Sequence, residues 1–241
     1  MKSFLLFAGL ILISHQAIAQ IITCGDTGSD KIDPTKIEKW TPDQKNEYQA
    51  TYHFGFSDFE SLLFIIIAND SCYAQIRDGY WTTTNGEQVW IRRYETLKNV
   101  RIEGNKFYSD KTNGEFVIYN LNNKKTKGLI VYNPWSRPKK EGISELGFYQ
   151  GTVQVWYNGR FPYASYRFLN EVELEKMSLQ DLKIMRNEIY ARYEFIFTQG
   201  GEMDNYFRNQ KWYGGNNKNV DSFMTGLEKQ NIQLIQKIEK K

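Results

Sequence analysis

The chain has 241 residues, with 31 basic and 28 acidic side chains and a formal net charge of +3. This near-neutral balance argues against nucleic-acid binding, which needs a concentrated basic face. With 2 histidines and 2 cysteines, the sequence also lacks the cluster of nitrogen and sulfur ligands that a zinc site requires, so we expect no metal or other cofactor.

The first twenty residues, MKSFLLFAGLILISHQAIAQ, have the pattern of a secretory signal peptide. A lysine precedes an apolar run from Phe4 to Ile13, and the small-x-small motif Ala17-Ile18-Ala19 follows. The apolar run, about ten residues, is too short to cross the ~30 Å core of a bilayer as a helix. We therefore expect residues 1–19 to be removed. The protein would then be periplasmic, outer-surface or extracellular, with no transmembrane segment.

The two cysteines, Cys24 and Cys72, both lie in the expected mature chain. A lipid anchor at Cys24 would need a small residue directly before it, whereas Ile21-Ile22-Thr23 precedes, so we do not expect one. In an oxidising compartment two cysteines most simply form one disulfide. The sequence thus predicts a Cys24–Cys72 disulfide that ties an N-terminal segment, residues 20–47, to the first domain. A free reactive thiol is the alternative.

Residues 48–169 have the pattern of a β-rich domain. YQATYHFGF alternates aromatic and other residues, and SLLFIIIA is a short apolar run rich in β-branched side chains. Gly104-Asn105, Asn113-Gly114 and Asn158-Gly159 fall at hairpin spacing, and the last pair is the best candidate for a type I′ turn between two strands. About eight to ten short strands at this spacing predict an antiparallel β-barrel or sandwich.

Residues 170–241 have a helical period instead. Ser178 and Asp181, and later Thr225 and Glu228, have the spacing of capping boxes at two helix starts. Apolar residues then recur at intervals of three and four, as on one helical face. The predicted fold class is therefore α+β, with the β-barrel or sandwich followed by a small helical domain.

Three segments of the helical part carry a family resemblance. MRNEIYAR (residues 185–192) followed by FIF, YFRNQKWY (206–213) and LEKQNIQLI (227–235) resemble, in order and spacing, the YARHG domain. The His-Gly of that signature is Tyr193-Glu194 here. The resemblance implies a bacterial extracellular module of the kind that accompanies secreted proteins and lipoproteins. The β-rich part resembles regions that precede this domain in secreted Bacteroidetes proteins.

The signature residues suggest either a scaffold or an anion site. As a scaffold, Glu188 and Arg192 would support their helix as an i,i+4 pair, and Arg186 and Asn187 would bond carbonyls of the NQKWY turn. As a site, Arg186 and Arg192 would clamp a carboxylate or phosphate. The residues in question are Arg186, Asn187, Glu188, Tyr190, Arg192, Trp212 and Tyr213.

Motifs for catalysis are missing from the sequence. His53 is the only histidine of the expected mature chain, and no GxSxG, HExxH or phosphate-binding loop occurs. We therefore do not expect an enzyme. The alternative is a secreted hydrolase that cleaves cell-wall or other polysaccharide through a pair of carboxylates. Its loose candidates are Glu60, Glu87, Glu115 and Glu145.

The favoured hypothesis is a non-catalytic binding or interaction module of the bacterial cell envelope. Its partner would be a cell-wall glycan or an envelope protein. Aromatic side chains in the β-rich part could stack on such a ligand. Tyr80 and Trp81 are the candidates because they precede a polar turn.

Overall fold

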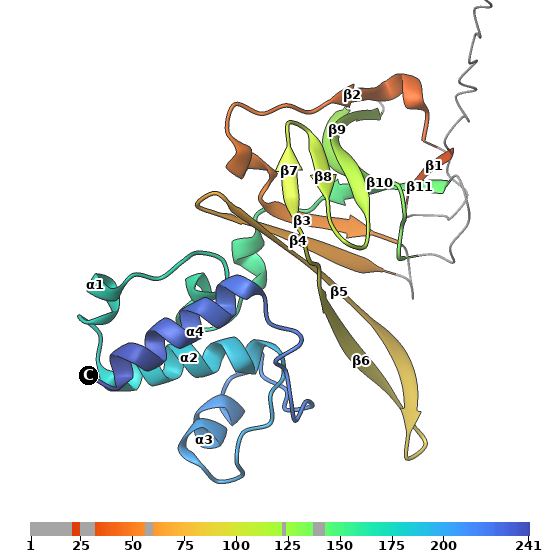
Figure 1. The fold of residues 1–241 in the computed structure, drawn as a ribbon. Helices are drawn as coiled ribbons and strands as arrows, with labels where there is room; N and C mark the ends of the chain where they lie inside the picture. The colour runs from red at the N-terminus through yellow and green to blue at the C-terminus, as the bar shows by residue number, and fades with distance from the viewer. Residues whose placement is uncertain (1–20, 25–31, 56–59, 122–123, 137–142) are drawn as a thin grey trace, which may run out of the picture.

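The computed structural model describes residues 21–24, 32–55, 60–121, 124–136 and 143–241. The predicted signal peptide lies outside these residues. Figure 1 shows a β-sheet part from which a long hairpin projects, and a helical part that packs beside it. Within the described residues, no helix is long and apolar enough to cross a membrane.

The β-rich part consists of one 11-stranded sheet. Its strands are β1 (Ile21–Cys24), β2 (Ile37–Lys39), β3 (Ala50–Phe54), β4 (Ser61–Ala68), β5 (Ser71–Thr84), β6 (Glu87–Thr96), β7 (Arg101–Glu103), β8 (Lys106–Tyr108), β9 (Asn113–Leu121), β10 (Lys124–Val131) and β11 (Ile143–Tyr149).

The sheet is antiparallel and open. Its strand order is β6-β5-β4-β3-β11-β10-β9-β8-β7, with β2 added at β9 and β1 paired in parallel with β11. Because the hydrogen-bonded path runs from β6 to β7 without returning, it does not close into a barrel. The sheet instead curls so that β7–β10 lie over β3–β5, as in a sandwich (Figure 1). This settles the predicted choice between barrel and sandwich.

Alternation along the strands explains the core between the two layers. Tyr52 and Phe54 of β3, Leu63 of β4, Phe116 of β9 and Leu129 of β10 belong to one buried cluster. Their neighbours along each strand point to the opposite face, because successive side chains of a strand alternate. A shared apolar face over three or more strands is what a sheet needs for independent stability.

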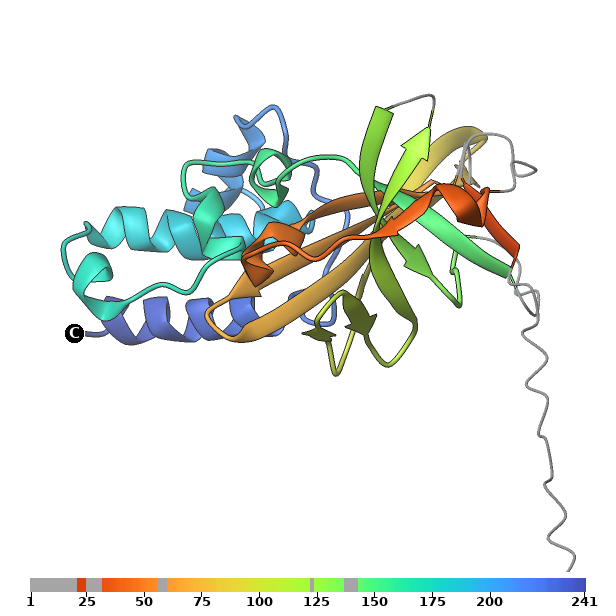
Figure 2. The ribbon, with the colours of Figure 1, turned by 90° about the horizontal axis from the view of Figure 1, so that it is seen from above.

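The helical part contains four α-helices in the described region: α1 (Glu171–Leu174), α2 (Leu179–Arg192), α3 (Glu202–Arg208) and α4 (Gly226–Glu239). The two predicted helix starts are confirmed. Ser178 caps α2 by accepting from the N–H of Asp181 at 3.1 Å, and Thr225 and Glu228 form a full capping box on α4. Figure 2 shows α2 and α4 lying side by side, with the C-terminus at the end remote from the sheet.

The segment between the last strand and α1 differs from the prediction. It holds 3₁₀ turns rather than a hairpin: η4 (Val153–Trp156) and η5 (Pro162–Ser165). Val153 and Tyr157 are buried against Phe64 of β4 and Leu227 of α4. This segment therefore joins the two parts through packing.

The predicted Cys24–Cys72 disulfide is not present. Cys72 is a free, half-buried cysteine near the start of β5. Cys24 ends β1 and pairs with Leu146 of β11, and strands β3 and β4 lie between β11 and β5. Neighbouring strands are ~4.8 Å apart, whereas a disulfide requires Cα atoms within ~7 Å. Accordingly, Figure 1 shows β1 at the opposite end of the sheet from the turn between β4 and β5.

Candidate functional site

The Glu188–Arg192 pair of α2 anchors the loop between η4 and η5. The Glu188 carboxylate accepts the backbone N–H groups of Arg160 at 2.7 Å and Phe161 at 2.8 Å. Arg192 donates to Glu188 at 3.0 Å, to the Asn158 carbonyl at 2.7 Å and to the Phe161 carbonyl at 2.9 Å. The two side chains are only 1% and 4% exposed. The i,i+4 pair that sequence spacing suggested is thus present, and it is also a buried structural junction.

Asn158-Gly159 forms no type I′ hairpin turn, because such a turn needs a positive φ at both residues and only Gly159 has one. The φ of Gly159 is +110°, a conformation that L side chains rarely adopt. A β-carbon there would lie 2.5 Å from the Glu188 carboxylate. The glycine therefore lets the loop approach Glu188 closely enough for the two backbone bonds.

The other signature residues also serve the helical core. Arg186 binds Glu239 at the end of α4 through two hydrogen bonds of 2.8 and 3.2 Å, and among the described residues it forms no hydrogen bond to the predicted NQKWY turn. The Asn187 amide donates to the Lys183 carbonyl at 2.7 Å, within its own helix. Tyr190, Trp212 and Tyr213 are partly buried against the core, and the Tyr213 hydroxyl bonds the Phe195 carbonyl at 2.7 Å.

The two residues that replace the signature His-Gly both contact the β-sheet. The buried Tyr193 hydroxyl donates to Glu228 of α4 at 2.7 Å and accepts from Gln75 of β5 at 2.9 Å. Glu194 has a φ of +61°, and its carboxylate forms an ion pair with Arg92 of β6, from which it accepts a hydrogen bond at 2.6 Å. Each side chain therefore holds the helical part on the β5–β6 hairpin.

A cleft of about 490 Å³ opens beside this junction. Its lining comes from β3, β4, β5, β6, the η4 segment and the end of α2: His53, Glu60, Ser61, Leu62, Phe64, Arg77, Asp78, Trp90, Arg92, Arg93, Tyr94, Trp156, Asn158 and Arg192. Its volume is within the range of ~300–1,000 Å³ that is usual for ligand pockets.

Trp90 of β6 presents its indole in this cleft because Gly79 lies beneath it. A β-carbon on Gly79 would come within 2.4 Å of the indole. Since position 79 has no side chain, the ring can lie directly against the backbone of β5. Trp156 of η4 also lines the cleft and meets the Phe64 ring edge-to-face at 6.1 Å. The cleft thus has aromatic groups on the sheet and on the adjoining segment.

Arg77 is held among aromatic rings at the same cleft. The carbon centre of its guanidinium lies 3.8 Å from the Phe64 ring centre and 4.8 Å from that of Tyr157, and Nε donates to Gln75 at 2.6 Å. Burial lowers the pKa of Arg77, but Tyr157, Tyr193 and Glu228 outweigh burial and raise it. Burial also raises the pKa of Tyr157 to about 12, against the opposing attraction of Arg77. Arg77 therefore stays positively charged.

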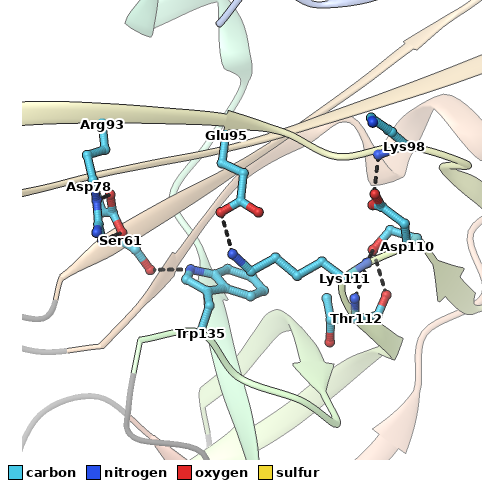
Figure 3. Close-up of polar contacts among 10 residues, drawn as sticks. Ser61, Asp78, Arg93, Glu95, Lys98, Asp110, Lys111, Thr112 and Trp135 are labelled. Atoms are coloured by element: carbon cyan, nitrogen blue, oxygen red, sulfur yellow. Dashed lines mark hydrogen bonds and ion pairs between the residues drawn. The ribbon is translucent and has the colours of Figure 1, made fainter. Parts of the chain in front are cut away.

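The β5–β6 hairpin also has polar contacts within itself and with its neighbours. Arg93 binds Asp78 through two hydrogen bonds of 2.8 and 2.6 Å. Figure 3 shows this pair near Trp135, whose indole N–H donates to Ser61, and near the Glu95–Lys111 ion pair. The Asp78–Arg93 pair joins the two strands of the hairpin, and the Glu95–Lys111 pair joins β6 to the segment before β9.

The predicted stacking residues lie near the cleft without lining it. Tyr80 and Trp81 of β5 are 47% and 55% exposed. Trp81 is paired with Trp90 across the hairpin, and the two ring centres are 5.3 Å apart. Sequence reasoning chose the exposed member of this pair. Gly79 was the available signal for Trp90, because a glycine inside a strand marks a close approach of another group.

The candidate carboxylates are dispersed. Glu60 lines the cleft, 3.9 Å from His53. Glu87 is exposed at the hairpin tip, Glu145 is buried beside Ser136, and Glu115 bonds Lys106 and Tyr132. Burial raises the pKa of Glu115, but those two bonds outweigh burial and lower it. In the described part of the chain, no three His, Cys, Asp or Glu side chains are grouped to hold a metal ion.

Comparison with curated proteins gave no match, and comparison with solved structures gave none either. Comparison with protein families gave one match. It covers the loop at Gly159, helices α1 to α4 and the Tyr193-Glu194 junction. The C-terminal third of the chain, residues 159–240, matches the YARHG domain, as its sequence signature predicted.

Proposed function

We propose that this protein is an exported, non-catalytic binding module of the bacterial cell envelope, and that it holds an envelope glycan in the cleft. The observation that most supports this proposal is the position of the Trp90 indole, which lies on Gly79 inside a cleft of about 490 Å³. An indole offers a flat apolar surface on which the apolar face of a sugar ring can stack. The YARHG match and the signal-peptide pattern support a location outside the cytoplasm.

The division of roles between the two parts supports this proposal. The signature arginines Arg186 and Arg192 are committed to Glu239, to Glu188 and to loop carbonyls, so they hold the helical part together. Tyr193 and Glu194 fix that part against β5 and β6. The YARHG-like part would thus serve as the rigid wall of a binding cleft.

Sedimentation with peptidoglycan sacculi and a panel of insoluble polysaccharides tests the proposal. The same samples are assayed for released reducing ends. We expect the protein to be retained by a glycan without releasing reducing ends. Turnover that is lost when Glu60 is changed to Gln would overturn the non-catalytic assignment.

Two tryptophan variants locate the site. Trp90→Ala removes the indole in the cleft, whereas Trp81→Ala removes its exposed neighbour on the same rung of the hairpin. We expect Trp90→Ala to abolish retention and Trp81→Ala to keep most of it. Equal retention by the parent and by folded Trp90→Ala would exclude the cleft as the glycan site.

A further inference from the structure

We propose that the cleft is specific for a glycan that bears a carboxylate, and that Arg77 receives this carboxylate while the sugar stacks on Trp90. This inference rests on the proposed function, because it names the chemical class of the ligand in the same cleft. The evidence for it is the ion pairing of the cleft arginines and the spacing of Arg77 from Gly79 along β5.

Three of the four arginines that line the cleft already have a carboxylate partner. Arg92 pairs with Glu194 at 2.6 Å, Arg93 with Asp78 at 2.6 Å and Arg192 with Glu188 at 3.0 Å. Arg77 is the exception, since no carboxylate of the described residues lies within ion-pair distance of it. Glu228 attracts it through space, but Glu228 Oε2 is bonded to Tyr193 and Thr225. An anionic ligand would supply the missing partner.

The guanidinium of Arg77 is held in place before any ligand arrives. Contact with the Phe64 ring at 3.8 Å and the Nε bond to Gln75 at 2.6 Å restrict its rotation. A long side chain that is already ordered loses less conformational entropy when it binds an anion. A planar guanidinium also matches the two oxygens of a carboxylate, with which it can form paired hydrogen bonds.

The spacing along β5 fits one sugar ring with an acidic substituent. Arg77 and Gly79 lie two residues apart, so their side-chain positions are on the same face, ~7 Å from each other along the strand. The Trp90 indole covers Gly79. A ring stacked on this indole therefore places a substituent near Arg77. A phosphate dianion fits less well, because only one guanidinium in the cleft lacks an anionic partner.

The test compares native glycans with glycans whose carboxylates have been neutralised. Peptidoglycan sacculi and alginate coupled covalently to agarose beads are each used before and after amidation with carbodiimide and glycinamide. Sedimentation measures retention of the parent protein, Arg77→Gln, Arg77→Lys and Arg93→Gln. Arg93→Gln is the matched control, because Arg93 lines the same cleft but is paired with Asp78. A thermal melt confirms that each variant is folded.

We expect amidation to weaken retention of the parent about tenfold or more, as loss of a charge-assisted bidentate contact would. Arg77→Gln should bind native and amidated glycan equally weakly, Arg77→Lys should lie between, and Arg93→Gln should resemble the parent. Retention of the parent that is indifferent to amidation would overturn the carboxylate inference and leave glycan binding standing. Absence of retention by every glycan in either form would overturn the proposed function itself.

Discussion

The hydroxyl of Tyr193 links the helical part to the sheet, and its removal should destabilise the protein measurably. Tyr193 is 1% exposed, and its hydroxyl donates to Glu228 at 2.7 Å and accepts from Gln75 at 2.9 Å. A hydrogen bond to a charged group contributes about 1.5–3 kcal/mol and a neutral one about 0.5–1.5 kcal/mol. Both partners keep other bonds, to Thr225 and to Phe223. We therefore expect Tyr193→Phe to lower the free energy of unfolding by about 2–3 kcal/mol.

Thermal and urea denaturation followed by circular dichroism measure this loss. For a chain of this size, each kcal/mol shifts the melting temperature by about 2–4 °C, so Tyr193→Phe should melt about 4–12 °C below the parent.

Tyr157→Phe is the matched control. Tyr157 is also buried, at 5% exposed, but its hydroxyl has no hydrogen-bond partner among the described residues. Removing an unbonded hydroxyl should change the stability by less than about 1 kcal/mol, in either direction. Equal destabilisation by the two substitutions, or a parent-like melt of Tyr193→Phe, would refute the reasoning that the Tyr193 hydroxyl joins the two parts.

Three further outcomes follow from the contacts. Arg186→Ala should lower the free energy of unfolding by about 1–2 kcal/mol, because it removes the two bonds to Glu239. Glycan retention should stay unchanged. Lost retention without destabilisation would mark Arg186 as a site residue. Because Cys72 is free, the intact mass of the exported protein should not rise on reduction, and a rise would indicate a disulfide. The hydrogen bond from the backbone N–H of Gly200 lowers the pKa of the Asp204 carboxyl below its ordinary value. The ionised Asp204 therefore stabilises the folded protein fully at a pH above the ordinary pKa, and this stabilisation is lost as the pH falls through the lowered pKa. Melts of Asp204→Asn from neutral to acidic pH should therefore approach those of the parent at the acid end, and a constant difference would contradict this.

The sequence by itself determined the features that depend on neighbours along the chain. Ser178 and Thr225 cap α2 and α4 because their hydroxyls accept from an N–H three residues ahead. The change of period near residue 170 predicted the helical part, and the three segments of the YARHG signature predicted its match to the YARHG domain. Such features can be predicted from the sequence because a helix start, or the buried face of a helix, depends only on the spacing of residues that are close in the chain.

Tertiary structure alone decided the features that join distant segments. Asn158-Gly159 has the composition of a hairpin turn, but the Glu188 carboxylate accepts the N–H groups of the two residues that follow, and 3₁₀ turns flank the loop. Position in the sheet likewise separates Cys24 from Cys72. Neither outcome follows from residue type, because each depends on a partner that the fold brings close.

The cleft is the clearest case of a feature that the tertiary structure decided and the sequence did not. Trp81 and Trp90 are alike in sequence, and only the placement of Gly79 beneath Trp90 puts that indole among the cleft residues. Arg77 is likewise one of four cleft arginines, and it differs from the others in its packing against the Phe64 and Tyr157 rings and in lacking a carboxylate partner among the described residues. A side chain's partners are set by the packing of β4, β5, η4 and α2 around it, which is why the ligand site could be located only after folding.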